Sequence, residues 1–370
     1  MSIRRLTLAL AAAALVVAAC GGDNSGSGSS ATTARAATTG AATTGAASTT
    51  ATTSGEKVTL RLGYYPNVTH ATALVGVEKG IFAEKLGPNV KLETATYNAG
   101  PAAIEALFAD AIDATYIGPN PAINGFAQSN GEALKIISGA TSGGAFLVVK
   151  PDINSPADLK GKTIASPQLG NTQDVALRKW LKDNGLSSDP SGGGDVSVKP
   201  QDNAATLDAF KQDQVQGAWV PEPWATRLVQ EGSGKVLVDE KTLWPQGQFV
   251  TTHLIVSSKF LKDHPDTVKA LLAGQVAAND YVNKNPADAQ KAANDQIEKI
   301  TQKRIAEGVI AAAWKNLTFT DDPVASSLKT SADNAIALEL LKPVDLAGIY
   351  DLGPLNEVLK AAGEPEVKDL

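Results

Sequence analysis

Two patterns of apolar residues alternate along the chain after residue 56. Short apolar runs bounded by Gly, Pro or Asn predict strands, and longer stretches with helical spacing predict helices. Strands are expected at residues 58–65, 90–95, 113–117, 134–137, 145–150, 163–166, 196–198, 217–220 and 249–257. Helices are expected at residues 71–79, 98–108, 122–128, 155–159, 173–184, 204–211, 266–284 and 286–301, and the chain beyond is mostly helical. This order predicts an α/β body, with parallel or mixed sheets flanked by helices.

The body is long enough for two lobes, because single hydrophobic cores rarely grow beyond about 250–300 residues. The apolar strands at 145–150 and 249–257 contain few turn signals, and we expect them to cross between the lobes. The first lobe is then predicted to consist of residues 57–145 and 250–370, with the C-terminal helices packed back on it. The second lobe is predicted to consist of residues 146–249.

The first twenty residues have the pattern of a secretory signal. Arg4 and Arg5 precede an apolar run that ends in Ala18 and Ala19, directly before Cys20. A charged segment, a short apolar segment and small residues at the end are typical of a signal peptide, predicted here as residues 1–19. Cys20 is the only cysteine, and its position resembles a bacterial lipobox, which implies cleavage before Cys20 and its lipidation. The alternative is an ordinary cleaved signal followed by an incidental cysteine.

The segment that follows Cys20 consists almost entirely of Gly, Ser, Ala and Thr. It contains no Leu, Ile, Val, Met or aromatic residue up to residue 55. Such a segment cannot bury enough apolar surface to offset the entropy of ordering. Residues 20–56 are therefore predicted to be a lipidated, disordered tether with a reach of roughly 30 Å.

Composition excludes several classes of function. The formal net charge is −6 and the basic residues are not clustered, which argues against nucleic-acid binding. The three histidines, His70, His253 and His264, lack the spacing of a metal site, and no hydrolase or nucleotide-binding motif occurs. We therefore expect neither an enzyme nor a bound metal or cofactor.

Five short blocks carry a resemblance to a known family. They are GYYPN at 63–67, EKGIF at 78–82, LFADAID at 107–113, DLKGKTI at 158–164 and PEPWA at 221–225. In this order they resemble the substrate-binding proteins of nitrate, sulfonate and taurine ABC importers. The resemblance implies a two-lobed type II periplasmic-binding-protein fold that closes on a small ligand by hinge motion. It also implies delivery of the ligand to an ABC permease with a cytoplasmic ATPase. Together with the signal pattern and Cys20, we expect an exported monomer that is anchored by lipid at the outer face of the cytoplasmic membrane.

The candidate ligand site lies in the strand-to-helix turns, because ligands of open α/β sheets bind outside the carboxyl ends of the strands. Free backbone N–H groups at helix starts also favour anions there. Helix capping, a hinge or packing would explain the same residues equally simply. The ligand-binding candidates are Asn67, Thr69, His70, Asn120, Ser142, Gly143, Gly170, Asn171, Thr172, Gln173, Glu222 and Trp224.

None of these turns presents Arg or Lys to a charged ligand. Arg227 is the nearest cation, and we expect it to be solvated or ion-paired. Asp174 is expected to complement a helix dipole, and His253 to be a structural residue of the returning strand. We expect a small oxyanion held by neutral donors, with an aliphatic sulfonate as the preferred ligand. Nitrate, taurine, bicarbonate and thiamine pyrimidine precursors are the alternative ligands, and a tethered ligand sensor is the alternative role.

Overall fold

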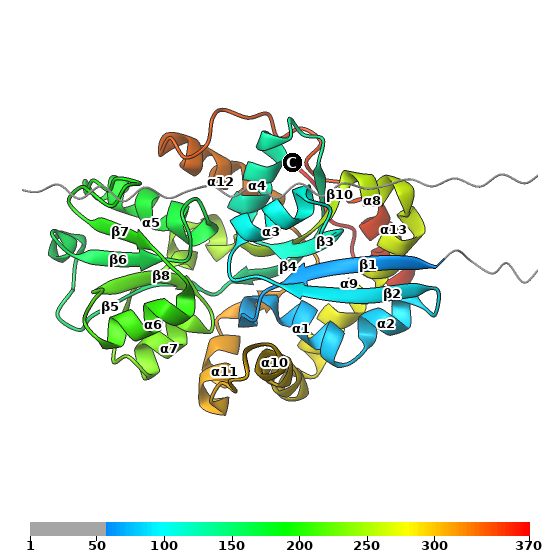
Figure 1. Cartoon of the computed structure of the whole chain (residues 1–370), viewed down its shortest axis with the longest axis horizontal. Helices are drawn as coiled ribbons and strands as arrows, with labels where there is room; N and C mark the ends of the chain where they lie inside the picture. Colours follow the sequence, from blue (N-terminus) through cyan, green and yellow to red (C-terminus); the bar gives the residue numbers. More distant parts are fainter. Residues whose placement is uncertain (1–56) are drawn as a thin grey trace, which may run out of the picture. The chain divides into compact units, whose positions relative to one another are not determined.

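The computed structural model of the chain describes residues 57–370, and the strands within this range form two separate mixed sheets (Figure 1). The predicted signal peptide, the lipidation site Cys20 and the tether lie outside the described residues. We define the first lobe as the six-stranded sheet with its helices and the second lobe as the five-stranded sheet with its helices.

The first sheet has the strand order β11-β4-β10-β3-β1-β2. Strand β1 is parallel to β2 and β3, whereas β10 runs antiparallel to β3 and β4. The short strand β11 extends the sheet antiparallel to β4. The strands are β1 Val58–Tyr64, β2 Val90–Thr96, β3 Ala114–Ile117, β4 Leu134–Gly143, β10 Val250–Ser257 and β11 Leu317–Phe319.

The second sheet has the strand order β7-β6-β8-β5-β9. Strand β6 is parallel to β7 and β8, and β5 is antiparallel to β8 and β9. The chain enters this sheet at β5 and re-enters the first sheet at β10, and these two strands are antiparallel to both of their neighbours. The strands are β5 Ala145–Val149, β6 Thr163–Ser166, β7 Ser197–Pro200, β8 Gly217–Pro221 and β9 Lys235–Asp239.

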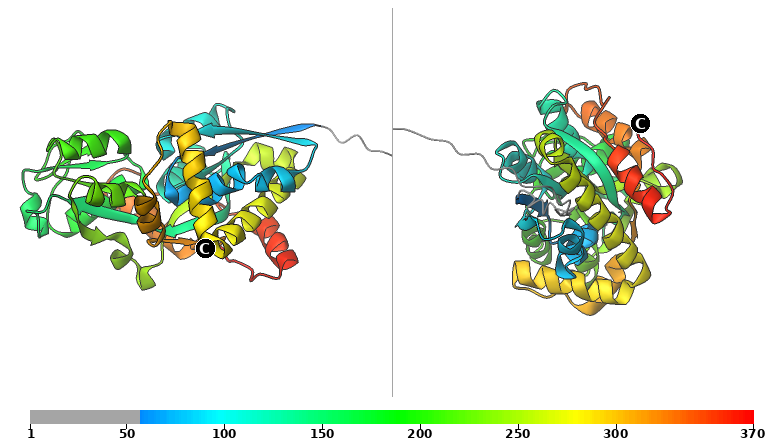
Figure 2. Two further views of the ribbon diagram at one scale, coloured as in Figure 1. Left: turned by 90° about the horizontal axis from the view of Figure 1, so that it is seen from below. Right: turned by 90° about the vertical axis from the view of Figure 1, so that its right-hand side faces the viewer.

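Helices cover both sheets (Figures 1 and 2). Helices α1 and α2 pack against α9, α1 also packs against α10, and α12 lies between α4 and α5. The helices before residue 240 are α1 Ala71–Glu78, α2 Ile81–Leu86, α3 Gly100–Phe108, α4 Pro119–Gln128, α5 Thr172–Asp183, α6 Asn203–Lys211 and α7 Trp224–Gln230, with 3-10 turns η1 Val68–His70 and η2 Pro156–Leu159. The later ones are η3 Glu240–Leu243, η4 Pro245–Gly247, α8 Ser258–Asp263, α9 Pro265–Lys284, α10 Pro286–Thr301, α11 Glu307–Trp314, α12 Ala325–Ala337 and α13 Gly353–Ala362.

The chain first passes between the sheets at Gly144, which joins β4 directly to β5. Gly143 and Gly144 have φ angles of +80° and +75°, a conformation that glycine adopts without steric cost. A Cβ atom on Gly144 would lie 2.1 Å from the Leu317 side chain, so a larger residue has no room there. The segment expected to make this crossing, 145–150, instead pairs as β5 with β8 and β9 inside the second sheet, so the passage occurs just before it.

The chain returns through the turns η3 and η4, between β9 and β10. The Glu240 carboxylate of η3 is buried and accepts hydrogen bonds from Nε1 of Trp219 (2.7 Å) and Nε1 of Trp244 (3.4 Å). Burial raises the pKa of Glu240 to about 7. The segment expected to make this crossing, 249–257, instead pairs along β10 with β3 and β4, so the passage occurs earlier in the chain.

Separate hydrophobic cores stabilise the two lobes. The first lobe has one large core, which extends from β1 and β3 to the C-terminal helices. The second lobe has one core on each face of its sheet. Trp219 and Leu177 belong to the core on the α5 face, and Phe210 and Leu207 belong to the core on the α6 and α7 face. Each lobe therefore has the interior it needs to move as a unit.

The strands and helices expected up to residue 301 are present, although their ends are shifted. The structure also contains elements that the sequence analysis did not predict. Strand β9 and helices α2 and α7 had no expected counterpart, because their apolar runs are short. The C-terminal helices do not pack on the first lobe alone, since α12 also contacts α5 and α11 contacts α7 of the second lobe. Among residues 57–370, no helix combines the length and apolar character needed to cross a membrane.

Candidate functional site

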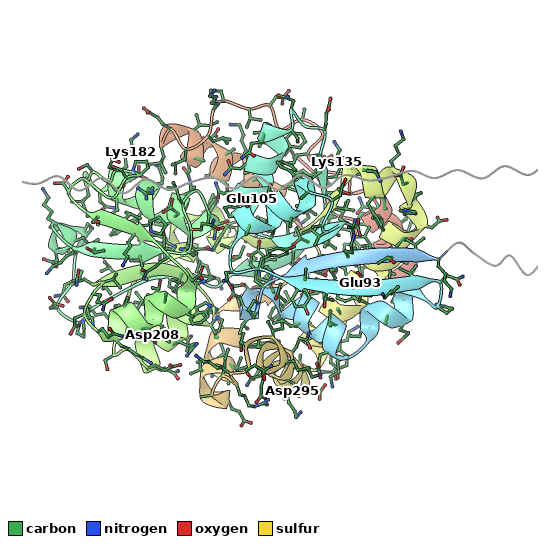
Figure 3. The ribbon with its side chains drawn as sticks, in the orientation of Figure 1. Glu93, Glu105, Lys135, Lys182, Asp208 and Asp295 are labelled. Atoms are coloured by element: carbon green, nitrogen blue, oxygen red, sulfur yellow. The ribbon has the colours of Figure 1, made fainter. Side chains whose placement is uncertain are left out.

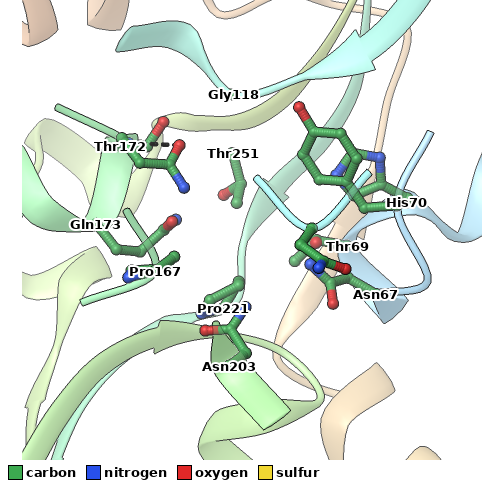
Figure 4. Close-up of a pocket in the computed structure, with 13 residues that line it drawn as sticks. Asn67, Thr69, His70, Gly118, Pro167, Thr172, Gln173, Asn203, Pro221 and Thr251 are labelled. Carbon is green, nitrogen blue, oxygen red and sulfur yellow. Dashed lines mark hydrogen bonds between the residues drawn. The ribbon is translucent and has the colours of Figure 1, made fainter. Parts of the chain in front are cut away.

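A small cavity lies where loops of the two lobes meet (Figure 4). Most of its lining follows the carboxyl ends of β1, β2, β3, β6, β7 and β8, where parallel strands present their loops on one edge of each sheet. The first lobe contributes Tyr65, Asn67, Thr69, His70, Asn98, Gly118 and Thr251, and the second contributes Pro167, Asn171, Thr172, Gln173, Asn203 and Pro221.

The loop after β1 is held in place through its backbone. The carbonyl oxygen of Thr69 accepts hydrogen bonds from the hydroxyls of Thr141 (2.8 Å) and Thr252 (3.0 Å). The carbonyl oxygen of Asn67 accepts from the backbone N–H of His70 (2.9 Å), which closes the turn η1. These bonds fix the loop and leave its side chains available to the cavity.

Two aromatic rings from this loop face the cavity as neutral groups. The rings of Tyr65 and His70 lie 4.2 Å apart between centroids. Burial lowers the pKa of His70 to about 3, so its imidazole is uncharged at physiological pH. Burial also raises the pKa of Tyr65, which keeps its hydroxyl protonated and able to donate.

The opposite wall is the N-terminal turn of α5. Asn171 is the N-cap residue, and its Oδ1 accepts a hydrogen bond from the backbone N–H of Thr172 (2.9 Å). The buried Asp174 carboxylate accepts from Ser166 Oγ (2.6 Å) and from Gly170 N (3.0 Å). Asp174 therefore ties the turn to the end of β6, as expected of a structural carboxylate.

Three helices begin at the cavity. Their N-cap residues are Gly118 for α4, Asn171 for α5 and Asp202 for α6, and each helix has at least nine residues. The N-terminus of a helix carries the positive end of the helix dipole and free N–H groups, although Pro119 and Pro121 leave the first turn of α4 with fewer N–H groups than the other two helices have. Their convergence favours a negatively charged ligand.

Four buried polar atoms of the lining have no hydrogen-bond partner within the protein. They are the Tyr65 hydroxyl, His70 Nδ1, the Thr172 hydroxyl and Asn203 Oδ1. Buried polar groups in proteins are nearly always paired, because an unpaired one costs about 1–3 kcal/mol. Since these four atoms surround one space and come from both lobes, a polar ligand would satisfy them together.

The lining contains no Asp, Glu, Lys or Arg. Within residues 57–370, His, Cys, Asp and Glu also form no cluster of three or more that could hold a metal ion. The arrangement can therefore bind a small polar ligand through neutral hydrogen-bond donors and helix termini. It offers neither a nucleophile with its base nor a pair of carboxylates for acid–base chemistry.

The two lobes lie close together at Gly118 and Thr172. A Cβ atom on Gly118 would lie 2.3 Å from Thr172 Oγ1, which is far inside normal contact distance. Polar bonds join the lobes nearby, from Asn98 Nδ2 to Asp202 Oδ2 (3.2 Å) and from Trp224 Nε1 to Asn67 Oδ1 (2.8 Å). The structure thus has the lobes in contact around the cavity.

Comparison with known proteins identifies the family. The model of the NMT1-like family matches residues 53–295. The chain belongs to the NMT1-like family. It is 25% identical to the taurine-binding periplasmic protein of Escherichia coli over 248 residues, which is 67% of this chain and 74% of that protein.

Solved structures agree with this assignment. The alkanesulfonate-binding protein SsuA of Xanthomonas axonopodis pv. citri, bound to MOPS, matches with a TM-score of 0.67 at 21% identity, covering 81% of this chain and 100% of that chain. The periplasmic nitrate-binding protein NrtA of Synechocystis PCC 6803 matches with a TM-score of 0.70 at 16% identity, covering 84% and 90%. The predicted resemblance to binding proteins of nitrate, sulfonate and taurine importers and the predicted periplasmic-binding-protein fold are confirmed. This NMT1-like chain shares the family and the fold of the solute-binding components of such importers.

Half of the site residues predicted from the sequence line the cavity of this NMT1-like protein. The structure brings together the polar residues of the turn after β1 and of the N-terminus of α5, from opposite lobes (Figure 4). These residues are Asn67, Thr69, His70, Asn171, Thr172 and Gln173.

Three other predicted residues have protein partners instead of facing the cavity. Asn120 is not an N-cap: it lies one residue inside α4, and its Nδ2 donates to the carbonyl oxygen of Ser331 (3.1 Å). The Glu222 carboxylate is buried and accepts from the Thr226 hydroxyl (2.9 Å) and from Asn316 Nδ2 (2.6 Å), and burial raises its pKa. Trp224 lies in a second groove beside the cavity.

Three predicted small residues lie next to the cavity without lining it. Gly143 ends β4, and its carbonyl oxygen accepts a hydrogen bond from the Thr251 hydroxyl (2.5 Å). Ser142 pairs with β10 and β11, and Gly170 donates its N–H to Asp174. These three residues shape the backbone around the cavity.

The cavity of this family member also contains residues that sequence reasoning missed. Asn98 and Asn203 are polar residues at strand-to-helix turns, so the signal used for Asn67 and Asn171 could have found them. Tyr65 directly follows β1 and carries the same positional signal. Gly118, Pro167 and Pro221 contribute shape and backbone, for which the sequence gives no chemical signal.

We predict that Gly118→Ala opens the two lobes without unfolding either. Gly118 has φ −71° and ψ 160°, which alanine adopts freely, so the only obstacle is the new methyl group against Thr172. Small-angle X-ray scattering should give a larger radius of gyration than wild type, while the melting temperature stays within about 5 °C, the shift that roughly 1 kcal/mol produces. Gly308→Ala in α11 is the control, because a Cβ there meets nothing within 4 Å. An unchanged radius for Gly118→Ala would contradict the close approach.

Proposed function

We propose that the protein is the extracytoplasmic solute-binding lipoprotein of an ABC importer and that it captures a small oxyanion, preferably an aliphatic sulfonate. It does so as a monomer, by closure of the two lobes, and delivers the ligand to a permease driven by a cytoplasmic ATPase. The observation that carries the proposal is the set of four unpartnered polar atoms from both lobes around one uncharged cavity. The confirmed family and fold support the importer role.

The charge of the proposed ligand follows from the helix termini. Three helix N-termini meet at the cavity, and no carboxylate or basic side chain lines it. An anion is stabilised by the helix termini without repulsion from the lining. A cation would face three positive helix ends and would find no counter-charge there.

The shape of the donor set favours several ligand oxygens that point in different directions. The Tyr65 hydroxyl and His70 Nδ1 lie on the first lobe and the Thr172 hydroxyl on the second, and these three groups line one small space, whereas the unpartnered atom of Asn203 is an acceptor oxygen. A sulfonate carries three oxygens that diverge from sulfur and can accept from both lobes at once. Each hydrogen bond to a charged group contributes about 1.5–3 kcal/mol when the donor is already in position.

Related proteins support this ligand class and also define the alternatives. The matched relatives and structures are named for taurine, alkanesulfonates, nitrate and bicarbonate. Nitrate, taurine, bicarbonate or a thiamine pyrimidine precursor would bind in the same role. A tethered ligand sensor is the alternative role, and it would bind its ligand without any effect on uptake.

We predict that simple alkanesulfonates bind more tightly than taurine. Ethanesulfonate and taurine share the sulfonate, but the ammonium group of taurine finds no carboxylate in the lining. Isothermal titration calorimetry should therefore give a dissociation constant at least tenfold lower for ethanesulfonate, a difference of about 1.4 kcal/mol. Equal or tighter binding of taurine would contradict a binding cavity without charged side chains. Binding of nitrate or bicarbonate alone would exclude the sulfonate while keeping the importer role.

We predict that Tyr65→Phe weakens sulfonate binding but does not destabilise the ligand-free protein. The Tyr65 hydroxyl is buried without a protein partner, so its removal breaks no bond of the fold. Loss of one charge-assisted bond should raise the dissociation constant of ethanesulfonate about tenfold or more, with no fall in melting temperature. Tyr350→Phe is a matched control, since its hydroxyl is also buried without a partner but lies outside the cavity. Equal affinities for both variants would remove Tyr65 from the site.

The lipid anchor is the remaining part of the proposal, and it rests on the signal pattern before Cys20. We predict that Cys20→Ser releases the protein from the membrane fraction of expressing cells and abolishes incorporation of labelled palmitate. Ser25→Ala, in the segment that follows, serves as a control for expression and export. Membrane association of the Cys20→Ser protein at the wild-type level would contradict lipidation.

A further inference from the structure

A buried ion pair lies next to the wall that α5 gives to the cavity. Arg178 Nε donates to Asp174 Oδ2 at 3.0 Å, and the two residues are one helical turn apart on α5. The side chain of Asp174 is fully buried and that of Arg178 is 2% exposed. Thr172 and Gln173, which directly precede Asp174, line the cavity. The pair therefore belongs to the element that presents the polar groups of the second lobe.

The other charged residues of α5 lie nearer the surface. Lys179 and Asp183 form an ion pair (2.5 Å) whose side chains are 28% and 55% exposed. Lys182, labelled in Figure 3, is exposed. Burying an ion pair rarely adds stability over an apolar pair of similar size, because both charges lose their hydration. The burial of Asp174 and Arg178 therefore calls for a reason other than stability.

The Asp174 carboxylate is enclosed by the loop that joins β6 to α5. Its oxygens accept hydrogen bonds from Ser166 Oγ and from the Gly170 N–H. Pro167 and Asn171, each the next residue along the chain, line the cavity. The negative charge of Asp174 thus lies within the loop that forms this side of the cavity.

That charge would oppose an anion in the cavity if it stood alone. The positive end of a helix dipole corresponds to about half an elementary charge, so a full negative charge in the first turn outweighs it. Arg178 supplies the compensating positive charge without entering the lining of the cavity. Its Nη1 and Nη2 are buried without a hydrogen-bond partner, so no second acceptor of the protein competes with Asp174 for the guanidinium.

Asp189 is a further carboxylate that experiences the charge of Arg178. Hydrogen bonds from Ser191 are the main cause of the lowered pKa of Asp189, and the positive charge of Arg178 adds to the effect. Asp189 is exposed in the loop after α5, where water screens its charge. Asp174 is therefore the buried carboxylate that Arg178 compensates.

We infer that Arg178 is a positioning residue of the anion site: it cancels the charge of Asp174 and, through that carboxylate, holds the turn at residues 170–173 in place. The inference rests on the proposed function, because it requires a negatively charged ligand in the cavity. Asp174 supplies the hydrogen bonds that shape the turn, and Arg178 makes those bonds compatible with an anion beside them. The pair thereby leaves the positive end of α5 available to the ligand.

The test changes the charge of the pair and measures the dissociation constant of ethanesulfonate on the full chain by calorimetry. Arg178→Met leaves one negative charge, Asp174→Asn leaves one positive charge, and the double variant leaves none. Asp174→Asn should bind most tightly, the double variant within about threefold of wild type, and Arg178→Met most weakly. Each unit of charge should change the dissociation constant about tenfold or more, because the pair is shielded from water and salt.

Lys179→Met is the control, since it removes one positive charge from the next position of the same helix, where the ion pair is partly exposed. It should leave the dissociation constant within about twofold of wild type. A merely structural pair would weaken binding in both single variants and in the double variant alike, whatever the charge, and this result would overturn the inference. Equal affinity in the wild type and all three pair variants would overturn it as well.

Both single variants leave a buried charge without its partner, so their melting temperatures should fall. If Arg178→Met does not fold, Asp174→Asn and the double variant still test the inference, because they differ only at residue 178. Binding about tenfold tighter by Asp174→Asn supports the inference, and equal binding overturns it.

Failure of the proposed function gives a different result. A wild-type chain that binds none of ethanesulfonate, nitrate and bicarbonate would overturn the proposed function, and this inference with it. Binding of ethanesulfonate by the wild type, with no dependence on the charge at residues 174 and 178, would overturn the inference alone.

Discussion

The close approach of Gly118 and Thr172 is the contact on which the rest of the site depends. With only a hydrogen in place of a side chain at Gly118, the starts of α4 and α5 face each other across the lobe boundary. A Cβ atom there would lie 2.3 Å from Thr172 Oγ1, so either the Thr172 side chain would have to rotate or the two helix termini would have to separate. The same approach allows Asn67 to reach Trp224 and Asn98 to reach Asp202. A single missing Cβ atom thus permits the convergence of groups that the two lobes supply separately.

The proposed site would favour an anion without any charged side chain in its lining. Burial lowers the pKa of His70 to about 3, so the residue that most resembles a cation is neutral. A buried Arg or Lys would pay a larger desolvation cost in the ligand-free protein than neutral donors and helix termini do. Their value depends on position, and the two threonine hydroxyls bound to the Thr69 carbonyl show how the loop is fixed before a ligand arrives.

The fold was largely predictable because the strands and helices of the two lobes have strong local patterns. Asn67, Asn171 and Thr172 could also be predicted as site residues, because the sequence itself shows that each follows the end of a parallel strand. The roles of Trp224 and Glu222 were not predictable, because their partners Asn67 and Asn316 lie 157 and 94 residues away. A side chain that could serve either a ligand or a distant partner gives the same sequence signal.

The bonds between the lobes are few, which sets the energy of closure. Trp224 to Asn67, Asn98 to Asp202 and Asn316 to Glu222 are single hydrogen bonds, each contributing about 1 kcal/mol net. Converting a population from 1% to 99% closed requires about 5.5 kcal/mol of differential binding. Only the charge-assisted bonds that an anion gains from the second lobe on closing, at about 1.5–3 kcal/mol each, count toward that amount. A ligand held by one lobe alone would have no such effect, so in the proposed mechanism the division of Tyr65, His70 and Thr172 between the lobes would couple binding to closure.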